Sequence, residues 1–107
     1  EDLDLAGVLA DALGATIAAA EVTAIYIEAH AANTNDVAVT RPASNGVPIF
    51  ALASGGLNIG PGDFFLLTSR KGIGVTAGTG DLLHVANGGA GTSVTYDVII
   101  LGRTVAA

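Results

Sequence analysis

Apolar and polar residues alternate with a period of two through much of the chain, which predicts β-strands. The clearest stretch is 81–103 (DLLHVANGGAGTSVTYDVIILGR), where a glycine-rich turn joins two extended segments. One face of the second segment is β-branched or aromatic. The other is polar at Thr95 and Asp97 and apolar at Ile99 and Leu101. We therefore predict a strand that is half-buried where it starts and buried on both faces where it finishes.

The first half of the chain shows the same period in shorter runs. Glu21–His30 predicts a strand with Ile25 and Ile27 facing the core. Turn residues rich in Asn, Gly and Pro separate this strand from the next apolar runs. Further short strands are predicted at 36–40, 47–53 and 57–59. Pro48 places the second of these at a sheet edge or a strand start.

Residues 1–20 fit two patterns. The spacing of Leu5, Val8 and Leu9 suits an amphipathic helix with acids at its start, and it also suits an edge strand with a bulge. A glycine at position 7 would cost a helix interior roughly 1 kcal/mol relative to alanine. We therefore favour a strand at Leu3–Leu9, followed by a loop or short turn around 10–15.

The second half contains a continuous apolar run, Phe64–Thr68, bounded by turns. Such a run is typical of a strand buried on both faces. Ser69–Gly72 comes next as a predicted exposed turn holding two of the four cations. The residues that alternate after this turn predict one more short strand: Ile73, Val75 and Ala77.

About eight short strands with turn signals between them are typical of a sandwich or a barrel. We predict an all-β fold, an antiparallel, jelly-roll-like β-sandwich forming one domain over 1–107, with 1–20 as a peripheral N-terminal segment. Phe64–Leu67 and Val94–Leu101 are expected to be central strands, and Leu3–Leu9 peripheral. On this interpretation Ile99→Asp would bury an unpaired charge and abolish folding.

Composition narrows the possible partners. The net charge is −6 with only 4 Lys and Arg, too few for the basic face that nucleic acid or anionic membrane requires. No apolar run approaches the ~20 residues that a membrane span needs, and the absence of cysteine rules out disulfides and thiolate metal sites. The chain begins at Glu1 rather than Met, so we expect a processed or partial product.

Three aspartates, Asp63, Asp81 and Asp97, are the carboxylates of the strongly patterned half. Two of them together could serve acid–base chemistry or bind Ca²⁺. However, Asp63 and Asp81 follow glycine in predicted turns and Asp97 lies on a solvated strand face, so structural roles are favoured. His30 and His84 lack metal-site spacing, and we expect hydrogen-bonded or interface histidines.

Two further patterns bear on enzyme motifs. The glycines at 72, 74, 78 and 80 lack the Lys-Ser/Thr of a phosphate-binding loop, and no helix is predicted after them. None of Ser54, Ser69 and Ser93 lies in a G-x-S-x-G nucleophile elbow. The sequence therefore predicts no catalytic, cofactor-binding or metal-ligating residues, and no enzyme.

The motifs PGDFFLL (61–67), GIGVTAGTGDLLHVAN (72–87) and GAGTSVTYDVIILGR (89–103), with DLDLAG (2–7) and AEVTAIYIEA (20–29), span most of the chain. In these motifs the chain resembles small β-structured virion proteins of tailed bacteriophages and related gene-transfer particles. The resemblance implies a structural part of the virion, such as a capsid decoration, head fibre or spike base. It implies other virion proteins, such as the major capsid protein, as partners and no catalytic residues.

The alternative function is a carbohydrate-binding or host-recognition module of a phage fibre. Sugar platforms usually present exposed aromatic rings, but this chain has no Trp, and Tyr26 and Tyr96 both lie in predicted strands. That weakens the alternative. A third hypothesis, a small enzyme with an unrecognised site, lacks any nucleophile–base spacing.

Self-association is the last expectation. The alanine-rich, aromatic-poor core buries little area per residue. Val22, Ala24 and Tyr26, with the Ile99/Leu101 face, are apolar on the side opposite the predicted core. A homo-oligomer would cover them, and a trimer is favoured over a pentamer among the axes that a capsid surface offers. The competing explanation is that Glu1–Ala20 folds over this face within one chain.

Overall fold

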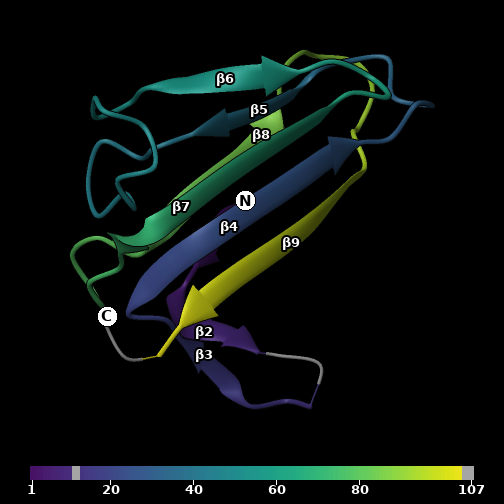
Figure 1. Cartoon of the computed structure of the whole chain (residues 1–107). Helices are drawn as coiled ribbons and strands as arrows, with labels where there is room; N and C mark the ends of the chain where they lie inside the picture. Colours follow the sequence, from purple (N-terminus) through teal and green to yellow (C-terminus); the bar gives the residue numbers. More distant parts are fainter. Residues whose placement is uncertain (11–12, 105–107) are drawn as a thin grey trace.

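The computed structural model describes residues 1–10 and 13–104 and contains no helix in that part of the chain (Figure 1). Its strands all pair antiparallel, in three sheets. The strands are β1 (Asp2–Asp4), β2 (Ala6–Ala10), β3 (Thr16–Ala18), β4 (Glu21–Ala29), β5 (Val37–Thr40), β6 (Gly56–Ile59), β7 (Phe64–Gly74), β8 (Leu82–Asn87) and β9 (Tyr96–Arg103). The all-β class predicted from the period-two pattern is therefore confirmed.

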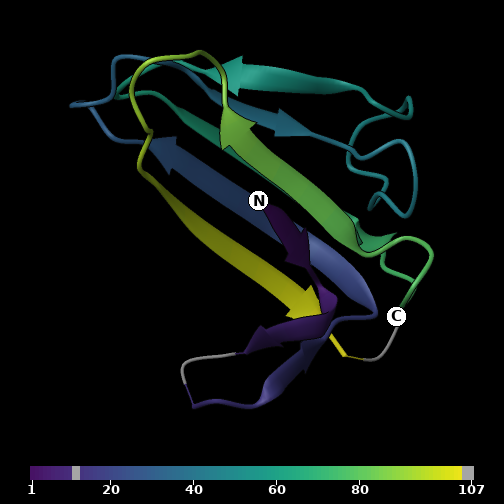
Figure 2. The same cartoon turned by 180° about the vertical axis from the view of Figure 1, so that it is seen from behind.

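The sheets join strands that are distant in sequence. The four-stranded sheet has the order β1-β8-β5-β6, the three-stranded sheet has the order β7-β4-β9, and β2 pairs with β3. The β4–β9 pair encloses the β5–β8 pair along the chain, so the connections are nested. β8 lies behind β7 in Figure 1 and in front of it in Figure 2, which places the larger sheet on one side of the smaller.

One hydrophobic cluster joins the two larger sheets. β4 contributes Ile25 and Ile27, both fully buried as predicted, and β5 contributes Val37 and Val39. Alternation explains this because every second side chain of each strand faces the same side. The remaining buried side chains of the cluster come from several elements: Leu3, Leu5, Val22, Ala29, Val47, Ile59, Val75, Leu83 and Val85.

A bulge changes the inward-facing side chains at the start of β4. The register shifts between Val22 and Ala24, where the single residue Thr23 stands opposite four residues of β7, Ser69–Gly72. Val22 is consequently buried, although strict alternation from Ile25 placed it on the outer side. The prediction for Val22 is therefore wrong, whereas Ala24 and Tyr26 keep the predicted side.

β7 is one strand of 11 residues where two short strands and a turn were predicted. Ser69–Gly72 remains within the strand as part of the bulge. The Ser69 hydroxyl accepts a hydrogen bond from the Gly72 N–H at 3.1 Å, and Gly72 adopts φ +94°. Phe64 and Leu66 are exposed, so the prediction of burial on both faces is wrong. The other sheet covers only one side of β7.

The same correction applies to β9, whose Ile99 and Leu101 are each 58% exposed. The strand is buried on one face only. The predicted central position is also wrong for both β7 and β9, because they flank β4, the central strand of their sheet. The glycine-rich turn within 81–103 joins strands of two different sheets, β8 and β9.

The strand predicted at 47–53 is absent, and the chain there forms turns and bends. Pro48 cannot donate a ladder hydrogen bond. The Arg41 guanidinium donates to the carbonyls of Phe50 and Ala51 at 2.9 and 3.4 Å, which gives this irregular backbone polar partners. Val47 is nevertheless fully buried, which explains the apolar pattern that suggested a strand.

The N-terminal strand predicted at Leu3–Leu9 is interrupted by a turn at Leu5. An Asp4 carboxylate oxygen accepts a hydrogen bond from the Ala6 N–H at 3.1 Å, a local bond that turns the chain. β1 is an edge strand of the larger sheet, yet Leu3 and Leu5 are buried in the core. Residues 13–15 are irregular as predicted, residues 11–12 lie outside the described residues, and β3 was not predicted.

Candidate interaction surface

The side of the three-stranded sheet that faces away from the core is apolar at its centre. Cross-strand register sets three rows on this side: Thr68–Ala24–Leu101, Leu66–Tyr26–Ile99 and Phe64–Glu28–Asp97. We call these nine residues the outer face. Its four large hydrophobic side chains are all exposed: Phe64 62%, Leu66 56%, Ile99 58% and Leu101 58%. Singly exposed apolar side chains are ordinary, but four on one sheet face form a patch of the kind that marks an interaction site.

The four-stranded sheet presents a contrasting surface on its own outer side. Alternation from the buried Leu3 and Leu83 places Asp2 and His84 on that side, where their side chains pair at 2.7 Å. The other outward residues of this sheet are small or polar, apart from the half-buried Leu82: Asp4, Ala38, Thr40, Gly56, Asn58 and Ala86. Only one of the two sheets therefore carries large exposed apolar side chains on its outer side.

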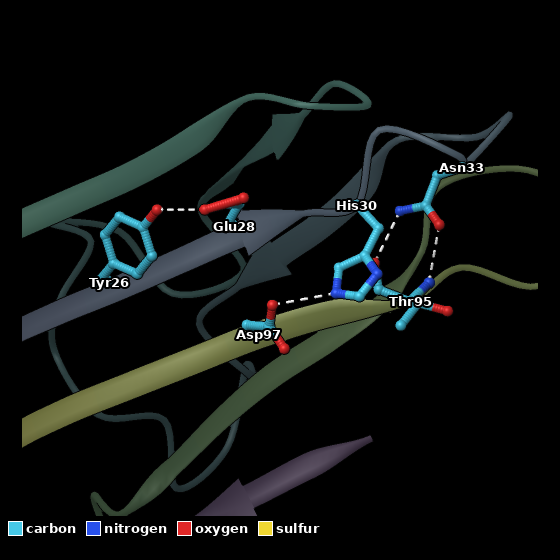
Figure 3. A network of polar contacts seen from close by, with 6 residues as sticks. All are labelled: Tyr26, Glu28, His30, Asn33, Thr95 and Asp97. Carbon is cyan, nitrogen blue, oxygen red and sulfur yellow. Dashed lines mark hydrogen bonds and ion pairs between the residues drawn. The ribbon is translucent and has the colours of Figure 1, made fainter.

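A polar cluster borders the outer face where β4 ends (Figure 3). The Tyr26 hydroxyl donates to a Glu28 carboxylate oxygen at 2.5 Å, and the His30 Nε2 lies 3.0 Å from an Asp97 carboxylate oxygen. The rings of Tyr26 and Phe64 are 5.4 Å apart, so an aromatic pair adjoins the cluster. The hydrogen bond to Glu28 is the main cause that raises the pKa of the Tyr26 phenol above its usual value.

Next to this cluster, hydrogen bonds join two loops. Asn33 donates from its amide to the Thr95 carbonyl at 2.8 Å and accepts from the Thr95 N–H at 2.9 Å (Figure 3). The Asn35 amide donates to the Thr92 carbonyl at 3.0 Å. Asn33 and Asn35 thus hold the β4–β5 connection against the β8–β9 connection.

We expect Glu28→Gln to lower the pKa of Tyr26 toward that of an ordinary tyrosine. The substitution removes the charged acceptor that favours the protonated phenol. Ultraviolet titration near 295 nm in a Tyr96→Phe background measures Tyr26 alone, because the chain has 2 tyrosines. Asp97→Asn is the matched control and should lower the pKa less, since Asp97 contributes only the weakest of the causes. An unchanged titration curve for Glu28→Gln would contradict the assigned hydrogen bond.

The three aspartates weighed as a possible site serve separate local structures. Asp81 is buried, and its carboxylate accepts from the Gly78 N–H at 2.7 Å, closing the turn that follows β7. The backbone of Asp63 closes the turn before β7 through its N–H to the Gly60 carbonyl at 2.9 Å. Asp97 pairs with His30 on the outer face. The turn roles predicted for Asp63 and Asp81 are confirmed.

The two histidines lie apart: His30 follows β4 of the three-stranded sheet, and His84 lies in β8 of the four-stranded sheet. His30 pairs with Asp97 and His84 with Asp2, which confirms the predicted hydrogen-bonded roles. The residues weighed as a phosphate loop form the β7 bulge and the turn at 76–80. Ser69 accepts the Gly72 hydrogen bond, Ser54 adopts φ 64°, and Ser93 lies in the loop before β9.

Sequence reasoning identified part of this surface. Ala24, Tyr26, Ile99 and Leu101 were predicted to need cover, and they lie together on the outer face. Phe64 and Leu66 were missed because a continuous apolar run does not show which of its faces is open. The competing explanation, that 1–20 covers this face, is wrong for the described residues, since Leu3 and Leu5 pack into the core instead.

Comparison with protein-family models, with curated proteins and with solved structures finds no match for the chain. Within residues 1–10 and 13–104 there is no group of three or more side chains able to hold a metal ion. The same residues include no helix long and apolar enough to cross a membrane.

Proposed function

We propose that the protein is a non-enzymatic structural component of a virion, attached to the particle surface as a capsid decoration, head fibre or spike base. The sequence resemblance to small β-structured virion proteins motivates the class. The observation that supports it most directly is the outer face, a sheet surface with four exposed large apolar side chains, beside a second sheet whose outer side carries no exposed large apolar side chain. A subunit that is covered on one side and solvated on the other has this distribution.

We further propose that the two larger sheets form a jelly-roll-like β-sandwich. The nested β4–β9 and β5–β8 pairs support this arrangement, because in jelly rolls the chain crosses repeatedly between two sheets that share one core. The partners we propose are copies of the same chain, with a trimer favoured over a pentamer, and other virion proteins such as the major capsid protein. Neither nucleic acid nor membrane is proposed as a partner.

The proposal is tested on particles rather than on the isolated chain. Particles are purified by density gradient from a culture that carries the gene, and the chain is quantified by mass spectrometry at each step. We expect a fixed copy number per major capsid protein that survives repeated washing, and a position on the particle surface in an image reconstruction. Loss of the chain from intact particles during purification would contradict a structural role.

The second candidate, a carbohydrate-binding or host-recognition module, is favoured by one observation. The exposed Phe64 ring, paired with Tyr26, lies opposite Glu28 in register, and a hollow of about 450 Å³ is lined by Phe64 and other residues of β6, β7 and the turn between them. An exposed ring beside hydrogen-bonding groups suits a sugar. A glycan array with saturable binding that Phe64→Ala removes would support this candidate, and an array without hits would exclude it for the glycans displayed.

A further inference from the structure

We propose that the outer face packs against the outer face of another copy of this chain, with the acidic end of one copy on the basic end of the next. This inference rests on the proposed self-association and specifies its contact. Because both copies use the same face, each such contact joins two copies as a two-fold pair.

The apolar centre gives the reason for contact. Ala24 and Tyr26 lie between Leu66 and Thr68 on one side and Ile99 and Leu101 on the other, so large apolar side chains flank the central strand. Covering such a surface is favourable by about 25 cal/mol per Å² of apolar area removed from water. No described part of the chain covers it, since all four large side chains of the face stay more than half exposed.

The two ends of the face carry opposite charge. Glu28 and Asp97 occupy the last row, and Asp63 directly precedes Phe64 of that row. At the far end of β4, Arg103 pairs with Glu21 at 3.1 Å, and its guanidinium also reaches the Arg70 carbonyl at 3.0 Å. Arg70, Lys71 and Arg103 are three of the 4 cations in the chain, so the cations are concentrated at one end of this sheet.

The charge distribution selects the orientation of the contact. Along β4 the two ends are seven residue steps apart, from Glu21 to Glu28, which is roughly 23 Å at about 3.3 Å per residue. That distance exceeds the ~10 Å Debye length at 0.1 M salt, so the ends interact little within one copy. If like ends met, the acidic ends of the two copies would repel each other, and so would the two basic ends. Running neighbouring sheets in opposite directions instead sets each acidic end against a basic end.

The size of the face predicts how tight the contact is. Three strands spaced at ~4.8 Å over about 23 Å give roughly 300 Å² per copy. Stable interfaces bury about 800 Å² per partner. The contact is therefore weak in solution, and neighbouring copies held on a particle would strengthen it by raising their effective concentration.

The test uses two double variants and sedimentation equilibrium at low salt, up to about 1 mM protein. Arg70→Glu/Lys71→Glu makes both ends acidic, and Glu28→Lys/Asp97→Lys makes both ends basic. We expect each variant to self-associate at least about tenfold more weakly than the native chain. An equimolar mixture should recover association, because unlike ends then meet. Far-UV circular dichroism and urea unfolding confirm that each variant is folded.

The two variants separate this contact from a general effect of net charge. Starting from −6, the first variant becomes four units more negative and the second four units less negative. If net charge alone governed association, the second variant would associate more strongly than the native chain. That result would overturn the inference, as would a mixture that behaves like its components or a native chain that stays monomeric throughout. The particle experiment, by contrast, tests the proposed function without reference to this contact.

Discussion

Ile25→Asp is expected to abolish the folded state. The Ile25 side chain is fully buried at the centre of β4, between Leu67 and Ile100 in neighbouring strands, within a cluster of hydrophobic side chains. An unpaired buried carboxylate costs several kcal/mol, of the order of the whole stability of a small domain, about 5–15 kcal/mol. Far-UV circular dichroism and urea unfolding should show no cooperative transition.

Ile99→Asp is the matched control on the same sheet. Ile99 is 58% exposed, so its carboxylate stays in water and the expected loss is about 1 kcal/mol, mainly from strand preference. This reverses the expectation from sequence, which placed Ile99 in the core. A folded Ile25→Asp variant, or an unfolded Ile99→Asp variant, would show that the faces of this sheet are assigned the wrong way round.

Gly56→Ala is the second substitution with a large expected effect. A Cβ at Gly56 would lie 2.2 Å from the Val39 carbonyl oxygen, a backbone atom of the neighbouring strand that cannot move without breaking the β5–β6 ladder. We expect a loss of roughly 2–3 kcal/mol, the upper range for overpacking. The loss of stability is measured from the shift in the urea midpoint, with the m-value unchanged.

Gly74→Ala provides the comparison for that substitution. Gly74 also lies in a strand, but nothing is within 4 Å of its Cβ position. Alanine there should be neutral or stabilise by about 0.4–1 kcal/mol, since it reduces the freedom of the unfolded chain. Equal losses in the two alanine variants would mean that the close approach of β6 to β5 does not constrain position 56.

The elements that sequence predicted well are those whose two faces differ. In β4 and β8, buried residues such as Ile27 and Val85 alternate with Glu28 and His84, so the pattern itself reports the inward face. In segments that are apolar on both sides, the pattern does not show which side faces the core. For Phe64–Thr68 and the end of β9, burial depends on whether another layer covers the second side, which is a tertiary property.

Other misses have local causes. The Val22 side chain faces inward because the register shifts at Thr23, which stands opposite four residues of β7 and has no counterpart on β9. Alternation along the sequence does not show where such a shift occurs. The buried Val47 suggested a strand, although Arg41 supplies hydrogen bonds to an irregular segment there. The sequence predicted the part of the outer face that β4 and β9 contribute, but not the part that β7 contributes. Its charged ends depend on register, which joins residues about 80 positions apart, such as Glu21 and Arg103.

The nested strand order also governs how this chain acquires its fold. β4 is central, but its partners β7 and β9 follow it in the chain only after β5 and β6. During synthesis, one edge of β4 therefore stays unpaired until β7 has emerged, and the other edge stays unpaired until β9 has emerged. Closing such long loops before any pairing is gained slows folding. Nascent chains of this protein are thus expected to be prone to aggregation, and chaperone binding should last until β9 has been made.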